Sequence, residues 1–275
     1  MLPHPRLICA AAALWCAALA PAGAQTEAEA GRALAKLWQQ HTRAPAEHAA
    51  IVQGVQQMEI QQANSPLLSV ARGLGAWHAL SAGQTSTARL FLTPLLAASA
   101  TDPIGTEARV FAQRWLTRLD REQVRASLQL YYRNHVDYPA ALSALGEMAV
   151  TNRPPPTDRF GREWKYELAA MKRLTKLRAQ RYNLTSVTLG DDSDLGAMLR
   201  RPYGAGLVLW RTTRFIGGEA GGAANVEFAR NNEKMVLSEG AKQAGVALVY
   251  ARVDPKGRDS MIIVTDGDYW WLFSR

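Results

Sequence analysis

Asp266 and Asp268 form a pair of carboxylates that could act as acid and base in this sequence. Two carboxylates on either side of a scissile bond do this chemistry in glycoside cleavage. Here, however, they enclose Gly267, and Asp-Gly is typical of a two-residue type I′ hairpin turn, which requires positive φ at both positions. A role in the turn is sufficient to explain both side chains.

Other catalytic motifs are missing from the sequence. No Gly-x-Ser-x-Gly motif is present, so an α/β-hydrolase triad has no nucleophile. The glycine-rich run 217–222 lacks the Lys-Ser/Thr ending of a phosphate-binding loop, and no helical pattern follows it directly. We expect this run to be a loop between strands.

Four histidines follow the first 24 residues: His41, His48, His78 and His135. His41 and His48 are seven residues apart with no carboxylate motif between them, and no cysteine follows residue 24. This spacing does not fit a zinc site. Each histidine is predicted to lie on a helix surface or to pack against other side chains.

The N-terminus has the pattern of a secretory signal peptide. Arg6 precedes the apolar run 7–19, and Ala22-Gly23-Ala24 supplies the small residues of a cleavage site before Gln25. The apolar run is too short for a membrane span, although a retained anchor is the alternative. Both cysteines lie in this leader. We therefore expect a periplasmic or secreted protein with no transmembrane span after signal cleavage.

Residues 27–135 have the apolar spacing of consecutive helices. Segments 66–82 and 84–98 resemble a tetratricopeptide-type helical hairpin, with Gly75 and Ala88 as the small residues where two helices approach closely. Such solenoids normally need three or more units, and the period is not clearly repeated, so a plain helical bundle is the alternative.

Two further helices are predicted before a break at Tyr138-Pro139. The first covers 104–119, and Asp120 is a candidate N-cap for the second, which covers 121–135. After residue 200 the helical periodicity ends and glycine, valine and aromatic residues increase. The pattern predicts strands at 207–211, 225–229, 234–238, 246–253, 260–265 and 269–273. Hairpins of this kind favour an antiparallel meander or a small barrel.

Trp270 and Trp271 are candidate partner-binding residues. Neighbouring side chains on a strand point to opposite faces, so only one tryptophan can be in the core of a half-buried sheet. We expect the other to be more than a third exposed. The alternative is that the helical part covers both.

In the middle of the chain, Tyr138-Pro139 is followed by a proline-rich link and by the run 158–166 (Asp-Arg-Phe-Gly-Arg-Glu-Trp-Lys-Tyr). Over about 60 residues this order resembles the Tyr-Pro, Asp-Pro-Trp-Gly-x-x-Tyr-x-Tyr order in the globular part of the major pseudopilin of type II secretion. Strands at 163–168 and 181–188 would pair above helix 121–135. The prepilin peptidase site and long apolar helix of pseudopilins are absent, so filament assembly is not implied.

The resemblance also implies a calcium site, because the final acidic loop of that family holds calcium. The corresponding residues are Asp191, Asp192 and Asp194. Three carboxylates and nearby carbonyls could supply the six to eight oxygens that calcium requires. The spacing departs from the family loop, and a solvated acidic turn or helix cap is the alternative. No other cofactor is expected.

The predicted fold class is α+β. A signal peptide (1–24) precedes a domain of helical hairpins or a bundle (25–119), a small pseudopilin-like α/β module (120–200) and a β-rich domain (201–275).

The predicted function is a non-enzymatic scaffold or accessory protein for envelope secretion or pilus-like assembly, with other envelope proteins as partners. The first alternative is a secreted hydrolase of cell-wall or polysaccharide material that uses Asp and Glu. The second is a module that docks onto anionic envelope polymers, which the formal net charge of +8 favours. A solvated basic surface also explains that charge, and nucleic acid is not an expected partner.

Overall fold

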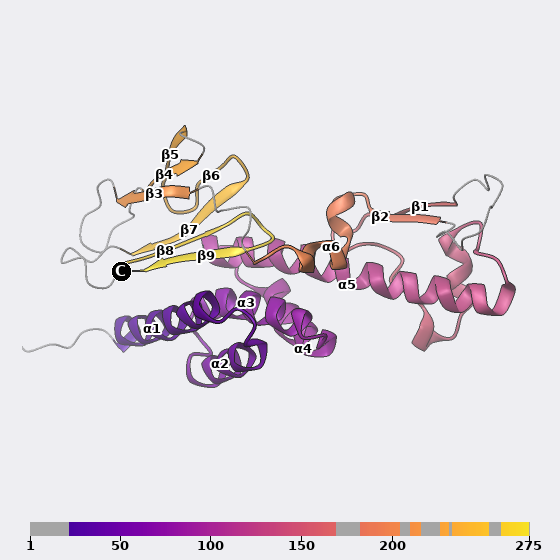
Figure 1. Ribbon diagram of the computed structural model, residues 1–275, viewed down its shortest axis with the longest axis horizontal. Helices are drawn as coiled ribbons and strands as arrows, with labels where there is room; N and C mark the ends of the chain where they lie inside the picture. Colours follow the sequence, from indigo (N-terminus) through magenta and orange to yellow (C-terminus); the bar gives the residue numbers. More distant parts are fainter. Residues whose placement is uncertain are drawn as a thin grey trace, which may run out of the picture.

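The structure is a computed structural model that describes six stretches of the chain, 22–168, 182–203, 210–215, 226–230, 233–252 and 260–274. Most of the predicted leader and the glycine-rich run 217–222 lie outside these residues. The described part is elongated, and one long helix runs from a body of helices and strands to a smaller module at the other end (Figure 1).

The predicted N-terminal helical bundle is confirmed. Its helices are α1 (Ala22–Arg43), α2 (His48–Gln61), α3 (Leu67–Ser81), α4 (Thr85–Leu92) and α5 (Pro103–His135), with a short 3-10 helix, η1 (Thr93–Ala97), between the last two. Almost every residue of α3 is buried, because α3 packs against α2, α4, α1 and α5. The bundle is therefore organised around α3.

Gly75 marks the close approach predicted for the hairpin of α3 and α4. A Cβ atom at Gly75 would lie 3.1 Å from the side chains of Phe91 in α4 and Val55 in α2. Ala88 is fully buried. Small residues at these two positions let three helices pack together, which is compatible with a tetratricopeptide-type hairpin and with a plain bundle.

Helix α5 is one helix of 33 residues where the sequence pattern predicts two. Its N-cap is Asp102, whose Oδ1 accepts a hydrogen bond of 2.6 Å from the Gly105 amide. The prediction that Asp120 caps a second helix is wrong, because Asp120 is a buried residue inside α5. Its carboxylate pairs with Arg89 and Arg159, so it does not compete for backbone amides as a cap would.

The module over the second half of α5 has the predicted two-stranded sheet. Strands β1 (Trp164–Leu168) and β2 (Tyr182–Ser186) pair antiparallel, and η2 (Leu142–Glu147) and η3 (Val150–Asn152) lie nearby. The sheet and α5 share a small core of Val124, Leu128, Leu145, Trp164, Tyr182 and Leu184. A two-stranded sheet is not stable alone, so α5 is the support on which it folds.

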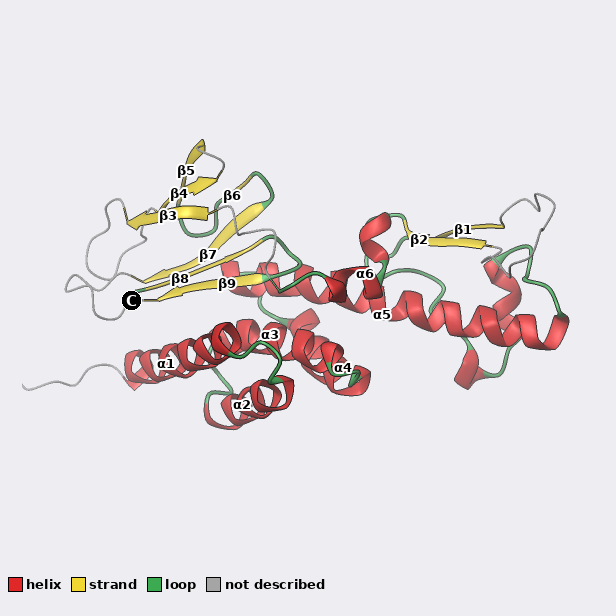
Figure 2. Ribbon diagram, viewed as in Figure 1, coloured by secondary structure: helices red, strands yellow, loops and turns green. Residues whose placement is uncertain are grey.

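The C-terminal part contains two antiparallel sheets and no barrel among the described strands. The first sheet has the order β3 (Trp210–Phe215), β4 (Val226–Arg230) and β5 (Glu233–Leu237). The second is a meander of β6 (Lys242–Gln243), β7 (Val246–Arg252), β8 (Met261–Thr265) and β9 (Trp270–Ser274). Helices α1 and α3 contact β9, and α5 contacts β7, so the bundle covers the meander (Figure 2). The meander prediction is therefore confirmed.

The loop between β8 and β9 differs from the predicted type I′ turn. Thr265 pairs with Trp270, so four residues form the loop, and Gly267 has positive φ but Asp266 does not. Oδ1 of Asp266 accepts hydrogen bonds of 2.9 Å from the amides of Asp268 and Tyr269. The aspartate therefore closes the loop with its side chain.

The prediction that Trp270 or Trp271 is exposed is wrong. Trp270 is fully buried, and Trp271 is 8% exposed. Side chains that alternate in direction along a strand include exposed ones only when one face of the sheet is open to water. Here both faces are covered, with Phe111 of α5 against Trp270 at 5.7 Å between ring centroids. Neither tryptophan is available to a partner.

Two hydrophobic cores result. The larger contains residues from α1 to α5 and from the C-terminal sheets, and the smaller lies inside the module. The predicted segments 25–119 and 201–275 thus pack in one core. The boundary at 119 and 120 falls inside α5.

Two glycines inside helices provide a test of this packing. An alanine Cβ at Gly73 would lie 2.5 Å from Nε1 of Trp270, whose rigid ring is fully buried. We expect Gly73→Ala to lower the free energy of unfolding by about 1–3 kcal/mol through overpacking. The control is Gly31→Ala, where the new Cβ lies 3.5 Å from Met261, an ordinary contact. That variant should raise the free energy of unfolding by about 0.5–1 kcal/mol, because alanine favours a helix more than glycine does. Urea denaturation measures the free energy of unfolding of both variants. Equal effects of the two substitutions would contradict the packing of α3 on β9.

Candidate functional site

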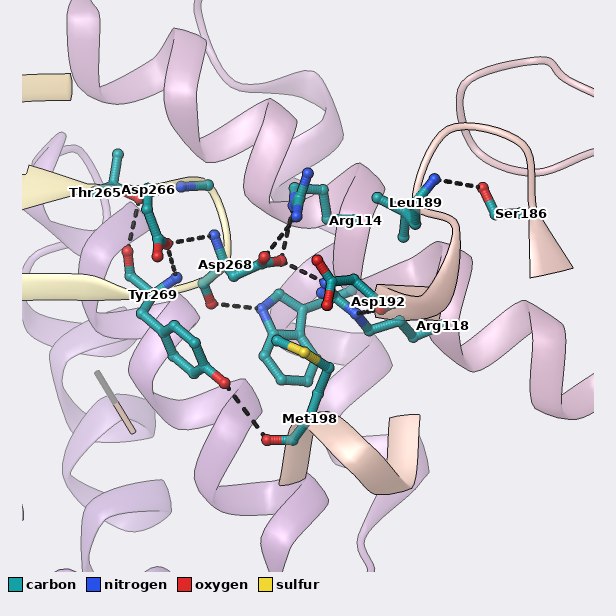
Figure 3. Close-up of polar contacts among 12 residues, drawn as sticks. Arg114, Arg118, Ser186, Leu189, Asp192, Met198, Thr265, Asp266, Asp268 and Tyr269 are labelled. Carbon is teal, nitrogen blue, oxygen red and sulfur yellow. Dashed lines mark hydrogen bonds and ion pairs between the residues drawn. The ribbon is translucent and has the colours of Figure 1, made fainter. Parts of the chain in front are cut away.

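A row of arginines on α5 forms the centre of a cluster of ion pairs and hydrogen bonds between distant segments. Arg114, Arg118 and Arg121 are four and three residues apart, so they lie along one side of the helix. Figure 3 shows Arg114 and Arg118 turned toward Asp268, which lies in the loop between β8 and β9.

Asp268 is held by three side chains of α5. Arg114 donates from Nε to Oδ1 at 2.7 Å and from Nη2 to Oδ2 at 2.5 Å. Arg118 donates from Nη2 to Oδ1 at 2.6 Å. Nε1 of Trp115 donates to the Asp268 carbonyl at 2.9 Å. This loop is therefore fixed to the middle of α5.

The two aspartates of the loop have opposite pKa shifts. Burial alone would raise the pKa of Asp268, but the hydrogen bonds and charges of Arg114 and Arg118 outweigh it and hold that pKa below its ordinary value. Burial raises the pKa of Asp266, only partly offset by the amides it accepts. Opposite shifts of two carboxylates can mark an acid and a base. Here each shift is explained by contacts that hold the loop.

The same arginines hold the segment after β2. Nε of Arg118 donates to the carbonyl of Asp192 at 2.7 Å (Figure 3). Arg121 donates to the Leu184 carbonyl in β2 at 2.7 Å and pairs with Oδ2 of Asp194 at 3.1 Å. The body and the module thus meet at adjacent turns of α5.

Asp120 makes the third connection of this junction. Its two carboxylate oxygens pair with Arg89 of α4 at 2.9 Å and with Arg159, in the turn before β1, at 2.5 Å. The neighbouring Asp158 accepts from the amides of Phe160 and Arg162 and from the Ser186 hydroxyl of β2. Residues 158–161 therefore form a turn, closed by the Gly161 amide, which donates to the Asp158 carbonyl at 3.0 Å, and the charges of α5 position it.

The loop predicted to hold calcium is occupied by other contacts. Asp194 caps the short helix α6 (Leu195–Arg200) by accepting from the Ala197 amide at 2.7 Å, and it pairs with Arg121. Asp192 lies 3.6 Å from Arg201, and Asp191 is exposed. In the described stretches, no group of three or more His, Cys, Asp or Glu side chains could hold a metal ion. The structure does not bring the three aspartates together as a calcium site.

Three of the four histidines lie together, which the sequence spacing did not indicate. Nδ1 of His41 is 3.0 Å from Nε2 of His78, and Nδ1 of His48 is 2.9 Å from Nδ1 of His78. The two ring nitrogens of His78 face different partners, so the rings form a chain and do not surround one point. The prediction that each histidine lies on a helix surface or packs against other side chains is confirmed. His41 and His78 are buried, His48 packs half-buried against His78, and His135 is exposed at the end of α5.

The module has a half-open cavity of about 580 Å³ on the side of β1. Its lining includes the proline run 154–156, Leu142, Trp164 and Tyr166, with Arg153 and Glu163 as its charged members. The polar atoms of its two aromatic residues are already used, because Trp164 donates to the Pro155 carbonyl and Tyr166 to the Pro139 carbonyl. The cavity is therefore mainly apolar and rigidly built, and its volume is in the range of ligand sites.

A further cavity includes two carboxylates, which the hydrolase alternative requires. Asp102 and Glu107 line a cavity of about 240 Å³ near the start of α5. Asp102 caps α5, however, and Glu107 pairs with Lys242 at 3.2 Å. Both carboxylates thus have structural partners, and no observation favours the hydrolase.

Comparisons with known proteins give no relative, since no protein-family model, curated protein or solved structure matches the chain. The likeness to pseudopilins remains a resemblance in the residue order of one segment. Among the described helices, none has both the length and the apolar character to cross a bilayer. The function is therefore argued from the geometry of α5 and its two cores.

The Asp268 cluster gives a direct stability prediction. Asp268→Asn removes the charge opposite Arg118, which has no solvent exposure. We expect the free energy of unfolding to fall by about 3 kcal/mol, because a buried charge loses its partner. Because the pKa of Asp268 is below that of an unfolded aspartate, this contribution is present above a pH of about 4 and is lost as the pH falls below it.

The matched control is Asp191→Asn, the same chemical change at an exposed carboxylate. It should change the free energy of unfolding by less than about 0.5 kcal/mol. Urea denaturation at pH 7 measures both variants. A loss below about 1 kcal/mol for Asp268→Asn would mean that the cluster does not hold the loop to α5.

Proposed function

We propose that this protein is a non-enzymatic, extracytoplasmic scaffold or accessory protein of envelope secretion or pilus-like assembly. The observation that carries the proposal is that α5 belongs to both cores. Phe111 and Trp115 are buried in the larger core, and Val124 and Leu128 in the module. One rigid helix, about 50 Å long at 1.5 Å per residue, thus holds two folded parts at a fixed spacing.

The use of the charged side chains supports a scaffold over an enzyme. The buried carboxylates of Asp120 and Asp268 and the guanidinium of Arg118 are paired between elements far apart in the sequence. Groups that act on a substrate are instead directed into a cleft. None of these three residues lines the cavities described above.

The module supplies the surface through which such a scaffold would act. The module lies at the end of α5 away from the bundle (Figure 1), and the residues lining its cavity are mainly apolar and include the proline run. Apolar grooves with few polar groups are suited to segments of other proteins. Its resemblance to the globular part of pseudopilins favours partners from secretion or pilus-like assembly.

A photo-crosslinking experiment in the cell tests this proposal. A crosslinking amino acid is placed at Ser143, which is exposed and lines the cavity, or at Val150, which is 80% exposed in the same module and does not line it. We expect Ser143 to crosslink an envelope protein of a secretion or pilus system, identified by mass spectrometry, and Val150 to give no such product.

Two results would contradict the proposal. One is that neither position crosslinks an envelope protein although the labelled variant is present in the cell. The other is recovery of the full-length protein in the cytosolic fraction, away from the envelope.

A further inference from the structure

The chain of three histidines joins three helices. His41 lies in the last turn of α1, His48 at the first position of α2, and His78 in the last turn of α3. His41 and His78 are buried, and His48 is half-buried. The two ring contacts of 3.0 and 2.9 Å are therefore part of the packing of α1 and α2 on α3.

Each of these contacts needs one N–H and one lone pair. Neutral rings meet this need, because each ring has one donor nitrogen and one acceptor nitrogen. A single proton on His78 would let it donate to both neighbours. A second proton, on His41 or His48, would place one N–H against another, and that contact would be lost.

The aromatic side chains that the structure places against these rings carry no formal charge. Trp77 is 6.1 Å from His41 and from His48 between ring centroids. Tyr203, which follows α6, is 5.1 Å from His41, and its hydroxyl accepts from the Trp270 amide at 3.1 Å.

The charged residues of the helix ends lie at the surface. Arg43 of α1 and Glu47, next to His48, are exposed, and the Glu47 carboxylate accepts from Gln40 at 3.5 Å. In the part of the chain that the structure describes, no carboxylate bonds to any of the three rings. Protonated His41 and His78 would therefore be buried with no carboxylate partner among the described residues.

We infer that the three rings form an acid-sensitive latch, which holds α1 and α2 on α3 while the rings are neutral and releases them when they take up protons. This latch follows from the packing of the helices and does not depend on the proposed scaffold role. Its use in the cell rests on the proposed extracytoplasmic location, where a protein meets the pH of the surroundings.

The direction of the pH effect follows from the burial of the rings. Burial, with smaller contributions from the neighbouring histidines, lowers the pKa of His41 to about 4 and that of His78 to about 3, from 6.5. The unfolded chain therefore binds more protons than the folded chain below pH 6.5. Stability is complete above that pH and is lost as the pH falls toward 4 and then 3.

Thermal unfolding at pH 7.5 and pH 5 tests the latch, because Asp268, whose pKa is lowered, stays charged over this range. We expect the midpoint of the wild type to fall by roughly 10 °C between these values. His78→Gln removes the central ring, and its midpoint should fall by about half as much, because only His41 then keeps a strongly lowered pKa. His135→Gln, at the exposed histidine of α5, should follow the wild type. An equal shift in His78→Gln and the wild type, or no shift in the wild type, would overturn the latch.

Two measurements on the wild type apply even if His78→Gln does not fold. In a proton NMR titration, at least two imidazole signals should titrate below pH 5, and titration of every histidine near pH 6.5 would overturn the inference. Hydrogen exchange, corrected for the intrinsic effect of pH, should show α1 and α2 losing protection at pH 5 before the centre of α5. Uniform loss along the chain would show global acid unfolding and no latch.

Discussion

The buried pairing of α5 with carboxylates and carbonyls from later in the chain is the interaction on which the whole arrangement depends. Arg118 is fully buried and contacts both Asp268 of the C-terminal meander and Asp192 of the loop after β2. A buried charge without its partner is strongly destabilising. Each of these segments therefore has one register along α5 in which the charges are matched.

This network specifies positions more than it adds stability. Burying ions removes their hydration, and a well-packed apolar group is often at least as stable in the same place. The pairs formed by Arg114, Arg121 and Asp120 give fixed points on successive turns. A protein that holds two surfaces at a set distance needs such fixed points.

Local signals in the sequence predicted much of the fold. Gly75 marked a close approach of helices, and alternation of side chains located most strands of the meander and the pairing of β1 with β2. These features depend on residues close in sequence or on regular spacing. For that reason the α+β class and the order of its parts were predictable.

The errors arose where a distant partner decides the role of a side chain. Asp120 has the residue type of a helix cap, but Arg89 and Arg159 bind it inside a continuous helix. The two tryptophans of β9 have the alternation of a half-exposed strand, but both faces of the sheet are covered. Local propensity gives way to tertiary contacts in both cases.

The candidate site was missed for the same reason. The partners of Asp268 lie about 150 residues earlier in the chain, and the histidines of the latch come from three different helices. No spacing rule connects such residues. Only the folded arrangement shows that Asp268, considered for catalysis, and Asp192 and Asp194, considered for calcium, are paired with arginines.

The most direct test of this account is the distance between two spin labels on α5. Thr106 and Asn134 are exposed near its two ends, and each is replaced by cysteine in a chain whose Cys9 and Cys16 are changed to alanine. One continuous helix predicts a narrow distribution of label-to-label distances centred at about 42 Å, as measured by pulsed electron paramagnetic resonance. A broad distribution, or one centred well below that distance, would show that the helix breaks near Asp120 and that nothing rigid joins the two cores.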